Sequence, residues 1–141
     1  MQLSLTLLLT ILLSSAAIAQ DRGQNVPENV KRSFLSDFPD AQRIFWQKQA
    51  SRYVIDFVLN GYDQEAHYSG TGTWHFTEIT VPESMMPSNA MAHCRNRYPG
   101  AMLLSTGYHD EESNRYYRVE VRFKGRTIQL QYDDDGNFIR D

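Results

Sequence analysis

Residues 26–41 read VPENVKRSFLSDFPDA, and residues 86–101 read MPSNAMAHCRNRYPGA. Sixty residues apart, the two stretches share prolines at their second and fourteenth positions, an asparagine at the fourth and an alanine at the sixteenth. Their apolar positions also correspond, and the matched pairs are Val30/Ala90, Phe34/Cys94 and Phe38/Tyr98. A spacing of four predicts one apolar helical stripe. The prolines suit a first helical turn and a helix end, so we expect a short helix in each stretch.

The correspondence between the two parts of the chain continues downstream. After a four-residue insertion the offset becomes sixty-four and holds to the C-terminus. The matched pairs are Tyr53/Tyr117, Gly61/Gly125, Tyr68/Tyr132, Gly72/Gly136 and Trp74/Phe138. Self-similarity at a fixed offset is typical of an internal repeat. The sequence therefore predicts two tandem copies, about 26–80 and 86–141.

Downstream of each predicted helix, apolar and polar residues alternate. Residues 117–123 place Tyr and three other apolar side chains on one side and charged side chains on the other, and residues 53–59 repeat the pattern. Strict alternation indicates half-buried antiparallel strands. Asn60-Gly61 and Lys124-Gly125 suit tight hairpin turns. With further strands expected at 43–48, 73–79 and 102–108, each unit is predicted to be α+β, a short helix followed by about four antiparallel strands.

The N-terminus carries a predicted export signal. Residues 1–19 read MQLSLTLLLTILLSSAAIA, in which an apolar run precedes the small residues Ala17-Ile18-Ala19. This order is typical of a secretory signal peptide cleaved after Ala19. The competing interpretation, a retained membrane anchor, needs about 20 apolar residues, and this run is shorter. We expect a single domain, 20–141, that is periplasmic or secreted and has no membrane insertion after cleavage.

Composition narrows the range of partners and of chemistry. The chain has 14 basic and 17 acidic residues, spread along its length, which excludes the basic patch of a nucleic-acid or anionic-membrane surface. A single cysteine allows no intramolecular disulfide. Because Cys94 lies on the predicted apolar stripe, we expect it to be buried and inert.

Several polar runs resemble functional motifs but lack the required spacing. The run 133–137, DDDGN, fails an EF-hand register, because the twelfth ligand position falls beyond the end, so a hairpin turn is predicted. His67, His75, His93 and His109 lack metal-ligand spacing and are expected to be ordinary exposed histidines. Asp110-Glu111-Glu112 is expected to be a solvated loop. We therefore predict no enzyme, no metal and no cofactor.

Strand alternation leaves one candidate for function, the outward sheet face. Arginine and other polar side chains can serve there as partner contacts. The candidate partner-binding residues are Arg118, Glu120, Arg122, Gln129, Gln131, His67 and His75.

The chain also resembles a known family. The residues that carry the resemblance are the pattern VPxxVxxxFxxxFPxA at 26–41, Trp46, the pattern YxxxFxxxG at 53–61, Tyr68 and Gly72-Thr73-Trp74. They resemble the bacterial PepSY-like proteins, which are exported and grouped with the β-lactamase inhibitory protein fold (BLIP-like). The resemblance covers about 26–141. It implies one curved antiparallel sheet built from both copies, with helices on one face and the other face open.

Two functional hypotheses remain open at the level of sequence. The preferred one is a non-catalytic exported module that uses the open sheet face to bind, and in its sharpest form inhibit, another envelope protein or a peptide; this rests on analogy of fold. The alternative is a small-molecule carrier or sensor that holds its ligand between the two repeats, which requires an apolar pocket of roughly 300 Å³ or more.

Overall fold

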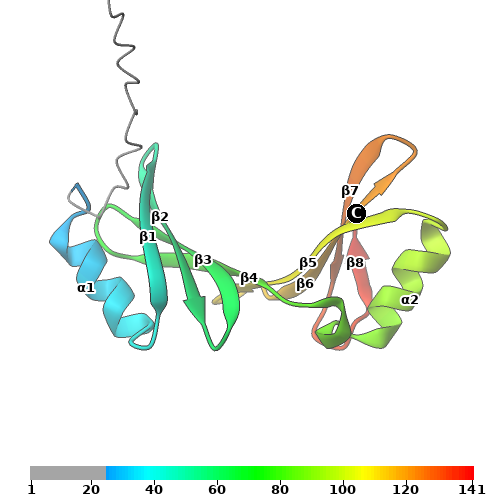
Figure 1. The fold of residues 1–141 in the computed structure, drawn as a ribbon, viewed down its shortest axis with the longest axis horizontal. Helices are drawn as coiled ribbons and strands as arrows, with labels where there is room; N and C mark the ends of the chain where they lie inside the picture. The colour runs from blue at the N-terminus through cyan, green and yellow to red at the C-terminus, as the bar shows by residue number, and fades with distance from the viewer. Residues whose placement is uncertain (1–24) are drawn as a thin grey trace, which may run out of the picture.

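The computed structural model describes residues 25–141, which form an α+β fold with two α-helices and one eight-stranded antiparallel sheet (Figure 1). The predicted signal peptide, 1–19, lies outside the described residues. No helix within 25–141 has the length and apolar character needed to cross a membrane. The elements are α1 (Glu28–Asp37), β1 (Gln42–Gln49), β2 (Arg52–Leu59), β3 (Tyr62–Ser69), β4 (Trp74–Thr80), the 3-10 helix η1 (Glu83–Met85), α2 (Ser88–Arg97), β5 (Met102–Glu111), β6 (Tyr116–Phe123), β7 (Arg126–Tyr132) and β8 (Phe138–Arg140).

The strands lie in the sheet in the same order as in the chain, β1 to β8, and every neighbouring pair is antiparallel. A helix followed by four strands occurs once on each side of η1. Figure 1 shows α1 and α2 at opposite ends of an elongated molecule, with β4 and β5 between them. The β4–β5 pairing therefore joins the two halves of the sheet.

Proline limits both α-helices, as the sequence predicts. Pro27 and Pro87 immediately precede the first helical residues, and the carbonyl of Pro27 accepts a hydrogen bond from the Val30 amide. The helices end at Asp37 and Arg97, two residues before the next prolines. Proline disfavours the α conformation in the residue before it, so each helix stops after about three turns.

Positive backbone angles close the predicted hairpins. Asn60 and Gly61 have φ values of 53° and 83°, and Lys124 and Gly125 have 49° and 77°. Two successive residues in the left-handed region are typical of the type I′ turn, whose twist matches that of its strands. Asp133 opens a further turn, because its carboxylate accepts hydrogen bonds from the amides of Asp135 and Asn137. The run 133–137 is thus a hydrogen-bonded turn, as expected.

Each half has its own buried core beneath its helix. In the first half, Phe34 of α1 is fully buried and packs edge-on against Trp46 and Phe57. In the second half, Cys94 of α2 is 3% exposed, and burial raises the pKa of its thiol. The first core comprises Val26, Val30, Phe34, Tyr53, Ile55, Phe57, Ala66 and Tyr68, and the second comprises Met86, Ala90, Met91, Cys94, Val119, Val121, Leu130 and Tyr132.

Both cores lie on the same face of the sheet. Directly opposed residues share a face, and such pairs lead from Ile55 in the first core through β3 to Thr77 and then to Asp110 of β5. From Val119 in the second core, the pair with Thr106 reaches the same side of β5. The opposite side, which neither helix covers, is called the open face below.

One predicted loop is instead part of a strand. Strand β5 extends to Glu111, so Asp110 and Glu111 pair with β4 rather than lying in a solvated loop. Asp110 forms an ion pair with Arg115, and Glu111 contacts a histidine described below. The expectation is wrong for Asp110 and Glu111 because charge alone predicts solvent exposure, whereas each of these two carboxylates has a polar partner in the folded chain.

Candidate functional site

A row of four stacked rings crosses the centre of the open face. The ring centroids of His67 and Phe76 are 4.1 Å apart, those of Phe76 and His109 are 5.0 Å apart, and those of His109 and Tyr116 are 4.6 Å apart. The planes of successive rings differ by 21°, 30° and 12°. The rings come from β3, β4, β5 and β6 in turn, so the row crosses the junction between the halves.

A β-bulge determines which ring of β4 joins this row. The pairing of β3 with β4 shifts between His67 and Tyr68, so that Phe76 lies opposite His67 and Trp74 lies opposite Tyr68. His75 is the extra residue, because two residues on a bulged strand oppose one on its partner. Phe76, and not the candidate partner-binding residue His75, is therefore the cross-strand neighbour of His67.

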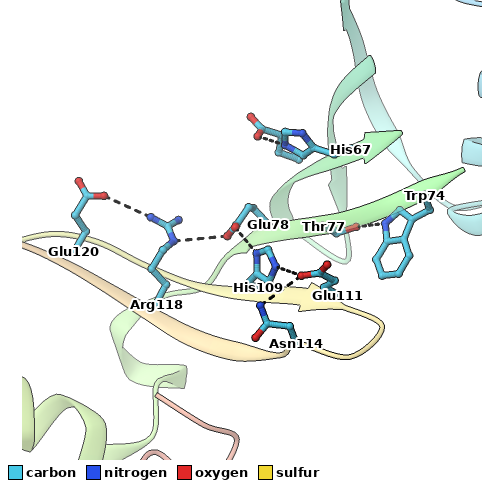
Figure 2. Close-up of polar contacts among 10 residues, drawn as sticks. His67, Trp74, Thr77, Glu78, His109, Glu111, Asn114, Arg118 and Glu120 are labelled. Atoms are coloured by element: carbon cyan, nitrogen blue, oxygen red, sulfur yellow. Dashed lines mark hydrogen bonds and ion pairs between the residues drawn. The ribbon is translucent and has the colours of Figure 1, made fainter. Parts of the chain in front are cut away.

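Carboxylates hold both histidines of the row. His67 Nε2 lies 2.6 Å from Glu65 Oε1, and His109 Nδ1 lies 2.6 Å from Glu78 Oε1 (Figure 2). His109 Nε2 lies 3.3 Å from Glu111 Oε2, so both of its ring nitrogens have an acidic partner. His109 is only 6% exposed. The expectation of ordinary exposed histidines is therefore wrong, because His109 is buried and His67, His75 and His93 are half-buried.

Arg118 extends the network from the second half toward the first. It lies opposite Gly107, whose missing side chain leaves room, since a Cβ there would come within 3.3 Å of the guanidinium. Its Nε lies 3.6 Å from Glu78 Oε2, and its Nη1 lies 3.6 Å from Glu120 Oε2 (Figure 2). Neither Glu78 Oε2 nor Arg118 Nε has a hydrogen-bond partner, although both atoms are shielded from solvent. The pair is thus an ion pair without a hydrogen bond.

Burial shifts the ionisation of two groups near the row. Desolvation raises the pKa of the Asp56 carboxyl, an effect that the hydrogen bond from Gln47 opposes and nearby Glu65 reinforces. Burial also raises the pKa of the Tyr116 hydroxyl, and the charge of Glu78 adds to it. At the centre of the open face, partial removal of water therefore disfavours the charged forms of Asp56 and Tyr116.

The structure brings most of the predicted site residues together. Arg118 pairs with Gln131 and Glu120 pairs with Gln129 across β6 and β7, while Arg122 is exposed. His67 lies on the same face in the first half, and the stacked rings of Phe76, His109 and Tyr116 connect it to the second half. The sequence did not predict Phe76 and Glu78 as members of this face, and it predicted Glu111 as part of a loop. Alternation from His109 and Arg118 could have indicated Glu111 and Tyr116, but the bulge hid the register of Phe76.

Two grooves border the open face. One has a volume of about 510 Å³ and is lined by residues of both halves, most of them charged or polar: Arg43, Asp56, Asp63, Gln64, Glu65, Glu78, Thr80 and Arg118, with Phe57 and Val58. The other, about 830 Å³, lies wholly in the second half, between Tyr98, the β6–β7 hairpin and the C-terminal residues. Neither groove is the apolar pocket between repeats that the carrier hypothesis requires.

The described part of the chain lacks the elements of a metal centre, since no group of three or more His, Cys, Asp or Glu side chains within residues 25–141 is arranged to hold a metal ion. Cys94, the sole cysteine, lies beneath α2, where a buried thiol with a raised pKa has little nucleophilic thiolate. What the open face offers chemically is therefore a set of hydrogen-bonding and charged groups.

Comparisons with known proteins agree with this architecture. A family model described as "Putative beta-lactamase-inhibitor-like, PepSY-like" matches residues 51–140. A BLIP-like protein from Bacteroides fragilis is similar in structure, with a TM-score of 0.73, 17% identity, and coverage of 81% of this chain and 83% of that one. A DUF2874 family protein from Bacteroides uniformis has a TM-score of 0.72, 22% identity and coverage of 81% and 86%. A structure from Bacteroides eggerthii, described as "putative periplasmic proteins", has a TM-score of 0.72, 17% identity and coverage of 82% and 86%. No curated protein matches the chain.

Proposed function

The chain belongs to the PepSY-like, beta-lactamase-inhibitor-like family, and from that premise we propose that it is a non-catalytic exported module that binds another envelope protein or a peptide through its open face. The observation that carries the proposal is the contrast between the two faces of one sheet. Both helices cover one face, whereas the uncovered face carries the ring row and its ion pairs. Polar side chains that are held in place by their neighbours, on a sheet face that no helix covers, are typical of a recognition site.

Rigidity supports a binding role for this face. Each histidine of the row contacts a carboxylate and a neighbouring ring, so its side chain has a defined orientation before any partner arrives. Preorganised side chains lose little conformational entropy on association. Arg122 and the exposed Gln129 extend the face into the second half.

Export follows from the leader sequence in this proposal. Residues 1–19 have the order of a signal peptide, and a structurally similar protein is described as periplasmic. We assign the chain to the periplasm or the external medium on these grounds. The proposal does not include β-lactamase inhibition, because a shared fold does not imply a shared function.

An origin by duplication is part of the same proposal. Ser69 and Asp133, sixty-four residues apart, open equivalent turns: the side-chain oxygen of each accepts hydrogen bonds from amides two and four residues later. Equivalent turns, helix ends and hairpins support two copies, 26–80 and 86–141, whose sheets are joined edge to edge at β4 and β5.

Affinity capture from an envelope extract tests the binding role. The baits are the chain from residue 20 onward, its Arg122→Glu variant and an Arg32→Glu control. Arg32 is an exposed residue of α1, the helix that covers the opposite face of the sheet, so the control makes the same charge reversal away from the open face. We expect the unaltered and control baits to retain one common protein that Arg122→Glu retains at least ten-fold less. Equal recovery by all three baits would remove the open face from the proposal. A partner lost only with Arg32→Glu would move binding to the helices.

A further inference from the structure

Three acidic residues occupy directly opposed positions on neighbouring strands of the open face. Asp56 of β2 lies opposite Glu65 of β3, and Glu65 lies opposite Glu78 of β4. Like charges in this relation destabilise a sheet. Repulsion between Asp56 and Glu65 contributes to the raised pKa of Asp56. A fold that places a row of like charges side by side incurs a stability penalty that an external cation would relieve.

The polar partners already present leave this row incompletely neutralised. Glu65 contacts His67, and Glu78 contacts His109 and Arg118. The contact between Arg118 and Glu78 is long, and Glu78 Oε2 has no hydrogen bond although solvent does not reach it. A charge-assisted hydrogen bond is normally shorter, about 2.7–2.9 Å. The contact with Arg118 therefore compensates the negative charge of the row only in part.

A groove lies directly over the row. Its volume is about 510 Å³, and it is lined by all three residues of the row, by Asp63, and by only two guanidinium groups, those of Arg43 and Arg118. Four carboxylates thus face two fixed positive charges. The groove has both the space and the excess negative charge to receive a further cationic side chain.

We propose that this groove receives an arginine side chain from a loop of the partner protein, so that its guanidinium lies between Asp56 and Glu65. This inference rests on the proposed function and specifies the chemistry of the partner. Cβ atoms of directly opposed residues are about 4.5–5.5 Å apart, which places two carboxylates side by side. The planar fork of a guanidinium donates to two such acceptors at once, whereas a lysine ammonium acts as a point charge.

A matched pair of peptides tests the groove directly. The isotope-labelled chain from residue 20 onward is titrated with Ac-Gly-Arg-Gly-NH2, and amide chemical shifts are followed by NMR. The control peptide replaces arginine with citrulline, which has nearly the same shape and no charge. A lysine peptide distinguishes guanidinium from simple positive charge. We expect the arginine peptide to shift signals around Glu65 and Glu78 with a Kd on the order of 1–10 mM, and the citrulline and lysine peptides to bind at least five-fold more weakly.

Two conservative variants localise the effect. Asp56→Asn retains an acceptor for the Gln47 hydrogen bond, and Glu65→Gln alters a side chain that is 43% exposed. The double variant is expected to weaken arginine-peptide binding at least ten-fold. Glu112→Gln, an exposed acidic residue outside the groove, is expected to change it less than two-fold. Equal binding of the citrulline or lysine peptide, unchanged binding to the double variant, or equal loss with Glu112→Gln would each overturn the inference.

The same double variant separates this inference from the proposed function. If a captured partner is lost with Arg122→Glu but retained by Asp56→Asn/Glu65→Gln, the open face still binds and the groove inference alone fails. If neither variant loses the partner, the proposed function fails as well. Loss with both, together with selective binding of the arginine peptide, supports both. Folding of the double variant is checked by its urea unfolding midpoint, which is expected to be at or above that of the unaltered chain, because the repulsion is relieved.

Discussion

The ion pair between Glu78 and Arg118 provides a quantitative test of the network on the open face. Arg118→Met removes the guanidinium but keeps much of the aliphatic stem, and Glu78→Gln keeps the size of the side chain but removes its charge. The side chains of Arg118 and Glu78 are 20% and 26% exposed. Together the two variants form a double-mutant cycle on one contact.

The expected magnitude follows from the separation and burial of the pair. Two unit charges about 4 Å apart interact by about 4 kcal/mol at an effective dielectric constant of 20. Desolvation of both groups and partial solvent screening oppose much of this attraction, and Glu78 Oε2 and Arg118 Nε form no hydrogen bond. We therefore expect a coupling free energy of about 1–2 kcal/mol. Arg118→Met alone is expected to destabilise the fold by about 2 kcal/mol, because it leaves a shielded carboxylate oxygen without a cation.

Urea unfolding followed by circular dichroism measures the four free energies of the cycle. Arg122→Met is the matched control, because Arg122 is exposed and such a substitution is expected to change the unfolding free energy by less than about 0.5 kcal/mol. A coupling energy below about 0.3 kcal/mol, the level at which independent sites add, would refute the view that these charges stabilise each other across the open face.

Three further outcomes are expected. Phe34→Ala should lower the unfolding free energy by about 4 kcal/mol, whereas Cys94→Ala at the corresponding position should lower it by about 1 kcal/mol, because the smaller side chain leaves a smaller cavity; equal losses in urea denaturation would contradict this. Because the folded pKa of Asp56 is raised, its contribution to stability is present at low pH and is lost as the pH rises through that pKa. Asp56→Asn should remove this loss, so the difference in urea unfolding free energy between the variant and the unaltered chain should grow in favour of the variant from about pH 3 to pH 7. A difference that does not change with pH would exclude the assignment. Burial and the hydrogen bond to Asp134 raise the pKa of Tyr108 to about 12; stability should fall between about pH 10 and 12 as this hydroxyl ionises only in the unfolded chain, and Tyr108→Phe should reduce the fall. An unchanged alkaline unfolding profile would contradict this last expectation.

The sequence predicted those parts of the fold that depend on local rules. Proline spacing defined both helices to within a residue, because proline acts on the backbone next to it. Alternation predicted β2 and β6, and the Asn-Gly and Lys-Gly pairs predicted the turns that follow them, because both signals depend on a few neighbouring residues. The same alternation placed Arg118, Glu120, Arg122, Gln129 and Gln131 on one face, as the structure does.

The centre of the open face was harder to predict, because it depends on register between strands. The bulge in β4 places Phe76, rather than His75, opposite His67, and no local pattern in SGTGTWHF indicates that shift. The burial of His109 depends on Glu78, which is distant in sequence, as well as on Glu111. Glu111 was interpreted as part of a loop because charged residues usually face solvent. The neighbour of His67, the burial of His109 and the pairing of Glu111 thus all depend on partners from other strands, which local sequence patterns do not specify.

The junction between β4 and β5 has a mechanical implication. Each helix packs on a core within its own half, so flexing at this seam changes the angle between the two ends without opening either core. The stacked Phe76 and His109, together with the contact between Glu78 and His109, span the seam and act as a brace across it. A substitution that removes either contact would therefore weaken the connection between the two halves while leaving both cores intact.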